Sequence, residues 1–133
     1  MDTKKLREQL EKRLNAVEDA YNETDRPAVD FSVYPEDLRA YEQASYDAIV
    51  VVEAARKIER ECGFGEIDWS NRDQGKWIPW FRMSPSAFAF YVTDYDYSSA
   101  SAGSGSRLRV LSDEATEHIG RRFTEMWEKL ELG

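Results

Sequence analysis

Histidine and cysteine, which often carry out acid–base and nucleophilic chemistry at neutral pH, are scarce in this chain. His118 is the only histidine and Cys62 is the only cysteine. A Ser-His-Asp or Cys-His site would therefore have to use His118. No nucleophile elbow surrounds a serine, and no cysteine-enzyme signature surrounds Cys62. We interpret His118 as a residue on the surface of a helix. We expect no catalytic residue and favour a non-enzymatic function, with a small enzyme as an open alternative.

Metal and phosphate sites are also poorly supported by residue spacing. Residues 94–97 begin like a calcium loop, which needs Gly at the sixth position and Glu at the twelfth. Counted from Asp94, these positions hold Ser99 and Gly105. The glycine pairs at 63–65 and 103–105 do not open a helix beside a lysine, as phosphate loops do. We expect no bound metal and no cofactor. Paired carboxylates for glycoside chemistry stay open, because their separation in space decides that question.

The aromatic and arginine side chains between residues 76 and 111 are the best candidates for a binding surface. Trp, Tyr and Arg dominate binding hot spots. Arg107 and Arg109 are two residues apart, so a strand would place them on one face. The alternative is that the aromatic residues form core and the arginines form surface ion pairs. The candidate binding residues are Trp77, Trp80, Phe81, Asp94, Tyr95, Tyr97, Arg107 and Arg109.

Two helices are predicted before this region. Leucines recur at helical spacing over residues 3–22, with Thr3 as the expected N-cap. A second helix is predicted over residues 36–61, because Pro35 suits a helix start and Gly63 suits a helix end. Its expected buried face consists of Leu38, Tyr41, Ala48, Val52 and Ala55.

Three short strands and a last helix are predicted after residue 75. The strands are expected near 76–81, 88–92 and 107–111, and Pro79 predicts an edge strand or a bulge in the first. Ser112 is the expected N-cap of a helix over 113–131. The loop at 98–105 consists of small residues, and we expect it to be mobile. The predicted fold class is α+β, with two N-terminal helices, a small three-stranded antiparallel sheet and a C-terminal helix packed on the sheet.

Length and charge narrow the function classes. The chain has 133 residues and a net charge of −8, which fits one domain over residues 1–133. Its acidity opposes direct nucleic-acid binding and binding to anionic membranes. The N-terminus has no apolar signal region and the single cysteine suits a reducing compartment, so a cytoplasmic location is expected.

Several motifs resemble those of a family of small uncharacterised proteins from gut bacteria and their phages or prophages. The most specific are Trp-Ile-Pro-Trp-Phe at 77–81 and Gly-Ser-Arg-Leu at 105–108; Pro-Glu-Asp-Leu-Arg-Ala-Tyr at 35–41 and Asp-Trp at 68–69 add to them. The resemblance covers residues 35–130, and the chain departs from it at 54–60. It implies a phage-related context, a family-like core over residues 35–131, and no established activity. Residues 1–30 are then a helical N-terminal extension.

Three functions stay open at this point. The first is a non-enzymatic protein-interaction module that uses the aromatic strands and the loop at 94–105, with a host or phage protein as partner. The second is an acidic inhibitor that mimics nucleic acid and blocks a host defence or DNA-binding protein. The third is a small enzyme of unknown type. The sequence does not predict the oligomeric state.

Overall fold

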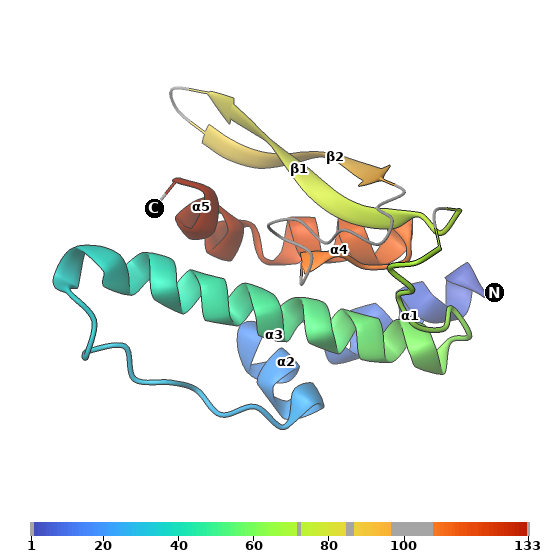
Figure 1. Cartoon of the computed structure of the whole chain (residues 1–133), viewed down its shortest axis with the longest axis horizontal. Coiled ribbons are helices and arrows are strands. Elements are labelled where there is room, and N and C mark those ends of the chain that lie inside the picture. Colours follow the sequence, from blue (N-terminus) through green and yellow to red (C-terminus); the bar gives the residue numbers. More distant parts are fainter. Residues whose placement is uncertain (1, 72, 85–86, 97–107, 133) are drawn as a thin grey trace.

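Helices make up more than half of the residues that the structure describes. The computed structural model describes residues 2–71, 73–84, 87–96 and 108–132, with the backbone alone for residues 80, 82–84 and 87–96. Figure 1 shows a β-hairpin packed on α4 and α5, which lie against the long helix α3. The elements are α1 (Thr3–Arg13), α2 (Val17–Thr24), the 3-10 turn η1 (Glu36–Leu38), α3 (Arg39–Glu61), β1 (Lys76–Ser84), β2 (Ala87–Asp96), α4 (Asp113–Arg122) and α5 (Thr124–Leu132).

The predicted first helix is two helices. α1 is capped by Asp2 rather than Thr3, and the Asp2 carboxylate accepts a hydrogen bond from the Lys5 amide at 3.1 Å. The helix stops at Leu14 because the carboxylate of Asp19 captures the amide of Ala16 at 3.0 Å and opens a second helix. The predicted leucine stripe is confirmed, since Leu6, Leu10 and Leu14 are all buried.

α3 is the central helix, as predicted, although its first turn is the 3-10 turn η1. Ala48, Val52 and Ala55 are buried in the core. Leu38 and Tyr41 are exposed, which contradicts the predicted continuous buried face. The first turns of α3 extend past the end of α2 in Figure 1.

The predicted three-stranded sheet, and with it the α+β class, is wrong. The described residues contain one two-stranded antiparallel sheet, with a register that runs from Lys76 opposite Asp96 to Ser84 opposite Ala87. The register shifts between Trp80 and Phe81. This irregularity directly follows Pro79, where a bulge was predicted.

The third strand is reduced to a single bridge. Val110 pairs with Trp77, through amide-to-carbonyl distances of 2.8 and 3.1 Å. The Leu111 amide, which strand alternation directs away from β1, donates to the carboxylate of Glu59 at 2.9 and 3.0 Å. Ser112 then caps α4, so the chain begins a helix two residues after the bridge.

The predicted last helix is also divided, with Phe123 at the junction of α4 and α5. Ser112 caps α4 as predicted, because its hydroxyl accepts a hydrogen bond from the Ala115 amide at 3.2 Å. α4 and α5 pack on the hairpin, and the rings of Phe81 and Trp127 have their centroids 5.9 Å apart. The predicted mobile loop at 98–105 lies outside the described residues.

Candidate functional site

The predicted aromatic site is only partly described. Trp77 and Phe81 are half-buried and pack against the hydrophobic core, so both contribute to the fold. Arg109 is also half-buried, and its carbonyl accepts a hydrogen bond from Arg56 Nε. The backbone register sets Tyr95 opposite Trp77 and Asp94 opposite Ile78, and Trp80 stands opposite Val92. The side chains of Trp80, Asp94 and Tyr95 are not described, and Tyr97 and Arg107 lie outside the described residues.

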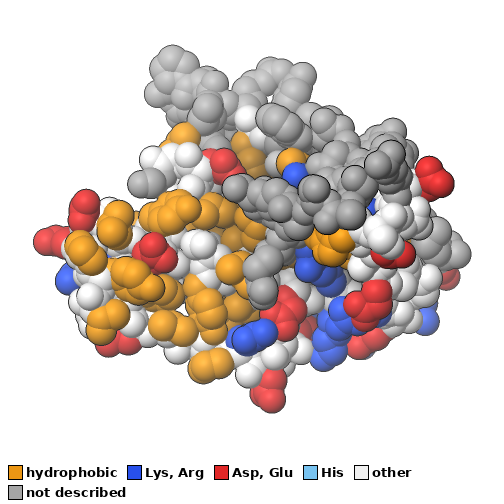
Figure 2. Space-filling model, viewed as in Figure 1, with side chains coloured by type: hydrophobic (Ala, Val, Ile, Leu, Met, Phe, Trp, Pro, Cys, Tyr) orange, Lys and Arg blue, Asp and Glu red, His pale blue; other side chains and the backbone are white. Residues whose placement is uncertain are grey.

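A different surface exposes large apolar side chains. It lies on the segment between α2 and α3 and on the first turns of α3, where Figure 2 shows hydrophobic side chains gathered on the viewed face. Val33 is the most exposed of them, at 84%. The exposed residues, which we call the apolar face, are Val29, Val33, Tyr34, Leu38 and Tyr41. Contiguous exposed apolar groups on a soluble protein mark interaction surfaces.

Hydrogen bonds fix the conformation of this segment, although it has no regular secondary structure. Arg39 Nε donates to the Tyr34 carbonyl at 2.9 Å, and its Nη2 donates to the Ser32 carbonyl at 3.2 Å. The Ser32 amide donates to Asp30 Oδ1 at 2.9 Å. A segment held in one conformation loses less entropy when it binds a partner.

Aromatic packing supports the same segment from beneath. The Phe31 ring lies 5.8 Å from the ring of Tyr34 and 6.0 Å from that of Tyr46. Tyr46 in turn lies 6.1 Å from Tyr21 of α2, and its hydroxyl donates to the Pro27 carbonyl at 2.8 Å. These four rings connect α2, the segment and α3, so the apolar face rests on the core.

Tyr21 is itself held by a polar contact to α3. Its hydroxyl donates to Asp47 Oδ1, and Gln43 Nε2 donates to the same carboxylate oxygen at 2.9 Å. Burial, followed by the hydrogen bond to Asp47, raises the pKa of Tyr21 well above its ordinary value. The Tyr21 hydroxyl therefore stays protonated at physiological pH and continues to donate its hydrogen bond to Asp47.

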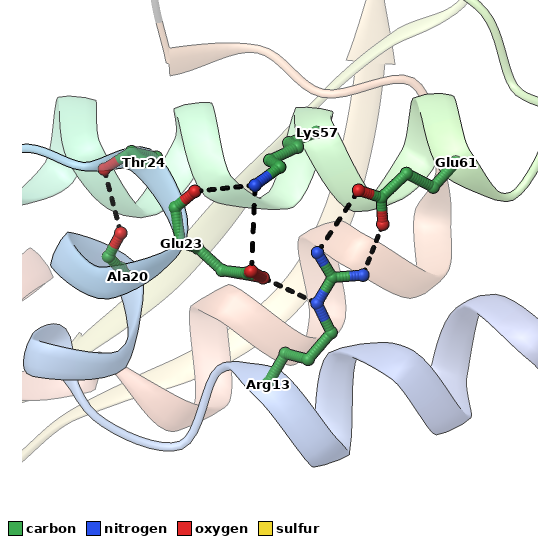
Figure 3. Close-up of polar contacts among 6 residues, drawn as sticks. All are labelled: Arg13, Ala20, Glu23, Thr24, Lys57 and Glu61. Carbon is green, nitrogen blue, oxygen red and sulfur yellow. Dashed lines mark hydrogen bonds and ion pairs between the residues drawn. The ribbon is translucent and has the colours of Figure 1, made fainter.

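A cluster of charged residues fixes the end of α2 from which this segment departs (Figure 3). Arg13 Nε lies 2.5 Å from Glu23 Oε2, and the same guanidinium pairs with Glu61 of α3. Lys57 Nζ donates to the Glu23 carbonyl at 2.8 Å. Hydrogen bonds to Glu23 and Glu61 raise the pKa of Arg13, so it keeps its charge. The cluster joins α1, α2 and α3, and Asp25 then leaves α2 in the left-handed conformation, with φ 60°.

Acidic residues are interspersed in the sequence with those of the apolar face. Residues 29–42 contain four carboxylates, those of Asp30, Glu36, Asp37 and Glu42, and a single arginine, Arg39. The Arg39 guanidinium is engaged by backbone carbonyls of the segment. The region therefore combines exposed apolar side chains with a net negative charge.

His118 is buried, which corrects its interpretation as a surface residue. It is 8% exposed, and its nearest described acid is Glu11, whose Oε1 lies 3.7 Å from Nε2. Neither ring nitrogen has a hydrogen-bond partner among the described residues. Burial lowers the pKa of His118 most, and Arg122 adds to that effect, while Glu11 opposes it. The ring is thus neutral near pH 7 and packs between α1 and α4.

Glu59 is a second buried ionisable group, and sequence analysis missed it. It lies within the apolar pattern of α3 and is fully buried. Its carboxylate accepts hydrogen bonds from the Leu111 amide and the Ser112 hydroxyl. Burial raises its pKa to about 7, against the lowering effect of these bonds and of Arg56. Because no solvent reaches Glu59, we assign it a structural role: it ties the start of α4 to α3.

Comparisons with protein-family models, with curated proteins and with solved structures give no match. Within the part of the chain that is described, no three His, Cys, Asp or Glu side chains are arranged to hold a metal ion. Over the same residues, no helix has the length and apolar character needed to cross a bilayer. Five of the six exposed large hydrophobic side chains among the described residues belong to the apolar face, which makes it the candidate site.

Proposed function

We propose that this protein is a non-enzymatic protein-interaction module that binds its partner through the apolar face. The observation that carries the proposal is the exposure of five large apolar side chains on the hydrogen-bonded segment between α2 and α3 and on the helical turns that follow it. Two of them are tyrosines, a residue type enriched in binding hot spots. The phage-related context implied by the resemblance at residues 35–130 belongs to the proposal, with a host or phage protein as partner and the cytoplasm as its location.

The charge around the apolar face specifies the chemistry of the partner. The stretch that carries the face, residues 29–42, holds four carboxylates and one arginine, so a partner with an apolar patch bordered by lysine or arginine is complementary. A second copy of this chain would set like charges against each other, which disfavours self-association through this face. We therefore propose that the partner is a different protein, with lysine or arginine residues around its apolar patch.

The test is to identify the partner by affinity capture from host lysate and then to measure its binding to purified variants by calorimetry. Val33→Asp and Tyr34→Ser replace exposed side chains and should leave the thermal melt unchanged. Each should weaken partner binding roughly tenfold or more. The matched control is Leu132→Ser, since Leu132 is 56% exposed and lies at the end of α5, outside the residues that define the face. Equal binding by all three variants would refute the proposal.

Salt dependence separates this function from nucleic-acid mimicry. The mimic hypothesis is supported by the net charge of −8, and it requires binding that weakens steeply as salt screens exposed charges. Binding led by the apolar face should weaken only modestly between about 50 and 300 mM salt, because rim charges contribute less than buried contacts.

A further inference from the structure

A cleft of about 410 Å³ lies between α3, the segment that follows it and Arg26. That volume falls within the range of small-molecule sites. The charged residues lining it are three arginines and two glutamates, so its lining carries a net charge of +1 in a chain of net charge −8. The residues on which the inference rests are Arg26, Arg56, Arg60, Glu53, Glu66 and Trp69.

The arginines converge because of helix periodicity and one contact across the chain. Glu53, Arg56 and Arg60 are three and four residues apart on α3, so they share one face of the helix. Arg26 reaches this face from the segment after α2, and its Nη2 lies 3.3 Å from Glu53. Arg56 Nε donates to the Arg109 carbonyl, which fixes the direction of its guanidinium.

Charge balance indicates which anion fits. The pair between Arg60 and Glu66 spans 3.3 Å, and the Glu66 side chain is 76% exposed. Such exposed pairs contribute little to stability, so an incoming anion can replace Glu66. The remaining lining would then hold three arginines and one glutamate, a net charge of +2. A phosphate monoester carries about −1.5 to −2 at pH 7, and guanidinium groups bind its oxygens in pairs.

Trp69 and Glu53 supply the other contacts that a nucleoside would use. Trp69 is half-buried in the wall, and its ring is fixed by the ammonium of Lys76, 5.6 Å from the ring centroid. Lys76 is fixed in turn by the carbonyls of Asn71 and Gln74, each at 3.1 Å. An indole face stacks on a planar base. The Glu53 side chain is 37% exposed beside Arg26, so its carboxylate can accept a hydrogen bond from a hydroxyl group.

We propose that this cleft binds a free nucleoside phosphate. The phosphate lies between Arg26, Arg56 and Arg60, the base stacks on Trp69, and a sugar hydroxyl donates to Glu53. The overall negative charge of the chain opposes binding of a long polynucleotide, which needs a basic surface along several phosphates. The inference is independent of the apolar face, which lies on other residues.

The probe is adenosine 5′-monophosphate, titrated into the purified protein by calorimetry beside adenosine and inorganic phosphate. Arg60→Gln should weaken binding of the monophosphate roughly tenfold. Trp69→Leu should weaken it as well, while Trp69→Phe should keep most of it because a ring is retained. Arg121→Gln is the control, since Arg121 also forms an exposed pair with a glutamate, Glu117, but on α4. Thermal melts establish that each variant is folded.

Three results would overturn the inference. One is the absence of binding by the monophosphate at millimolar concentration. Another is equal loss of binding in Arg60→Gln and Arg121→Gln, which would show a general charge effect. The third is inorganic phosphate binding as tightly as the monophosphate, since this removes the selectivity for a nucleoside phosphate.

Discussion

The buried carboxyl group of Glu59 should make the stability of this protein fall as pH rises. Its pKa is 4.5 when exposed and about 7 in the folded protein, mainly because burial disfavours the charged form. The folded state therefore holds a proton between these values that the unfolded state has released. The stabilisation is fully present below pH 4.5 and is lost as pH rises through about 7.

The size of the effect follows from this difference. Each tenfold change in proton affinity is worth about 1.4 kcal/mol, so the rise from 4.5 to about 7 amounts to about 3 kcal/mol. Glu59→Gln is the informative change, because the amide is uncharged and its oxygen can still accept the hydrogen bond from Leu111. The free energy of unfolding of Glu59→Gln minus that of wild type should therefore increase by about 3 kcal/mol between about pH 4.5 and pH 8.

Urea unfolding followed by circular dichroism at several pH values measures this difference. Other titrating groups, His118 among them, are common to both proteins and cancel. Glu59→Ala is the control, because it leaves the Leu111 amide and the Ser112 hydroxyl without their acceptor and should destabilise at every pH. A difference between Glu59→Gln and wild type that stays flat with pH would refute the reasoning.

Three further predictions test the helical core and its charged contacts. Ala48→Asp should lower the free energy of unfolding by several kcal/mol, because it buries an unpaired charge; Ala40→Asp, on the exposed side of α3, should change the urea midpoint little. Arg13→Ala should cost about 1–2 kcal/mol, since its pair with Glu23 is largely buried, whereas Arg7→Ala, whose side chain is 66% exposed, should cost less than about 0.5 kcal/mol. His118 has a lowered pKa, so its stabilisation is present above pH 6.5 and is lost as pH falls through the lowered value. His118→Gln should remove this acid-induced loss in the same urea measurements, and an unchanged acid profile would contradict it.

Local patterns predicted most of the helical residues but placed helix ends less well. The leucine stripe at 6, 10 and 14 marked the buried face of α1, and Ser112 marked the start of α4. The breaks at Leu14 and Phe123 were not predicted, because helical spacing of apolar residues continues across both. At the first break the Asp19 carboxylate captures amides that the helix would otherwise use, and the sequence allows either outcome.

The third strand and the candidate site both show where periodicity was insufficient. Residues 107–111 alternate as a strand should, but the described part of this stretch forms one bridge, and Ser112 begins α4 directly after it. Leu38 and Tyr41 continue the apolar rhythm of α3, yet both are exposed. Periodicity specifies which side chains could be buried together, but it does not specify whether another element reaches them.

The sequence by itself determined the order of the helices, the position of the hairpin, the place of the bulge beside Pro79 and the scarcity of nucleophilic chemistry. These follow from local spacing and from the residue types present. The tertiary structure alone decided that Val29, Val33 and Tyr34 are exposed, that Glu59 and His118 are buried, and that Arg26 joins Arg56 and Arg60. Burial and charge pairing depend on contacts between residues distant in the chain, and helix and strand periodicity carries no information about those contacts.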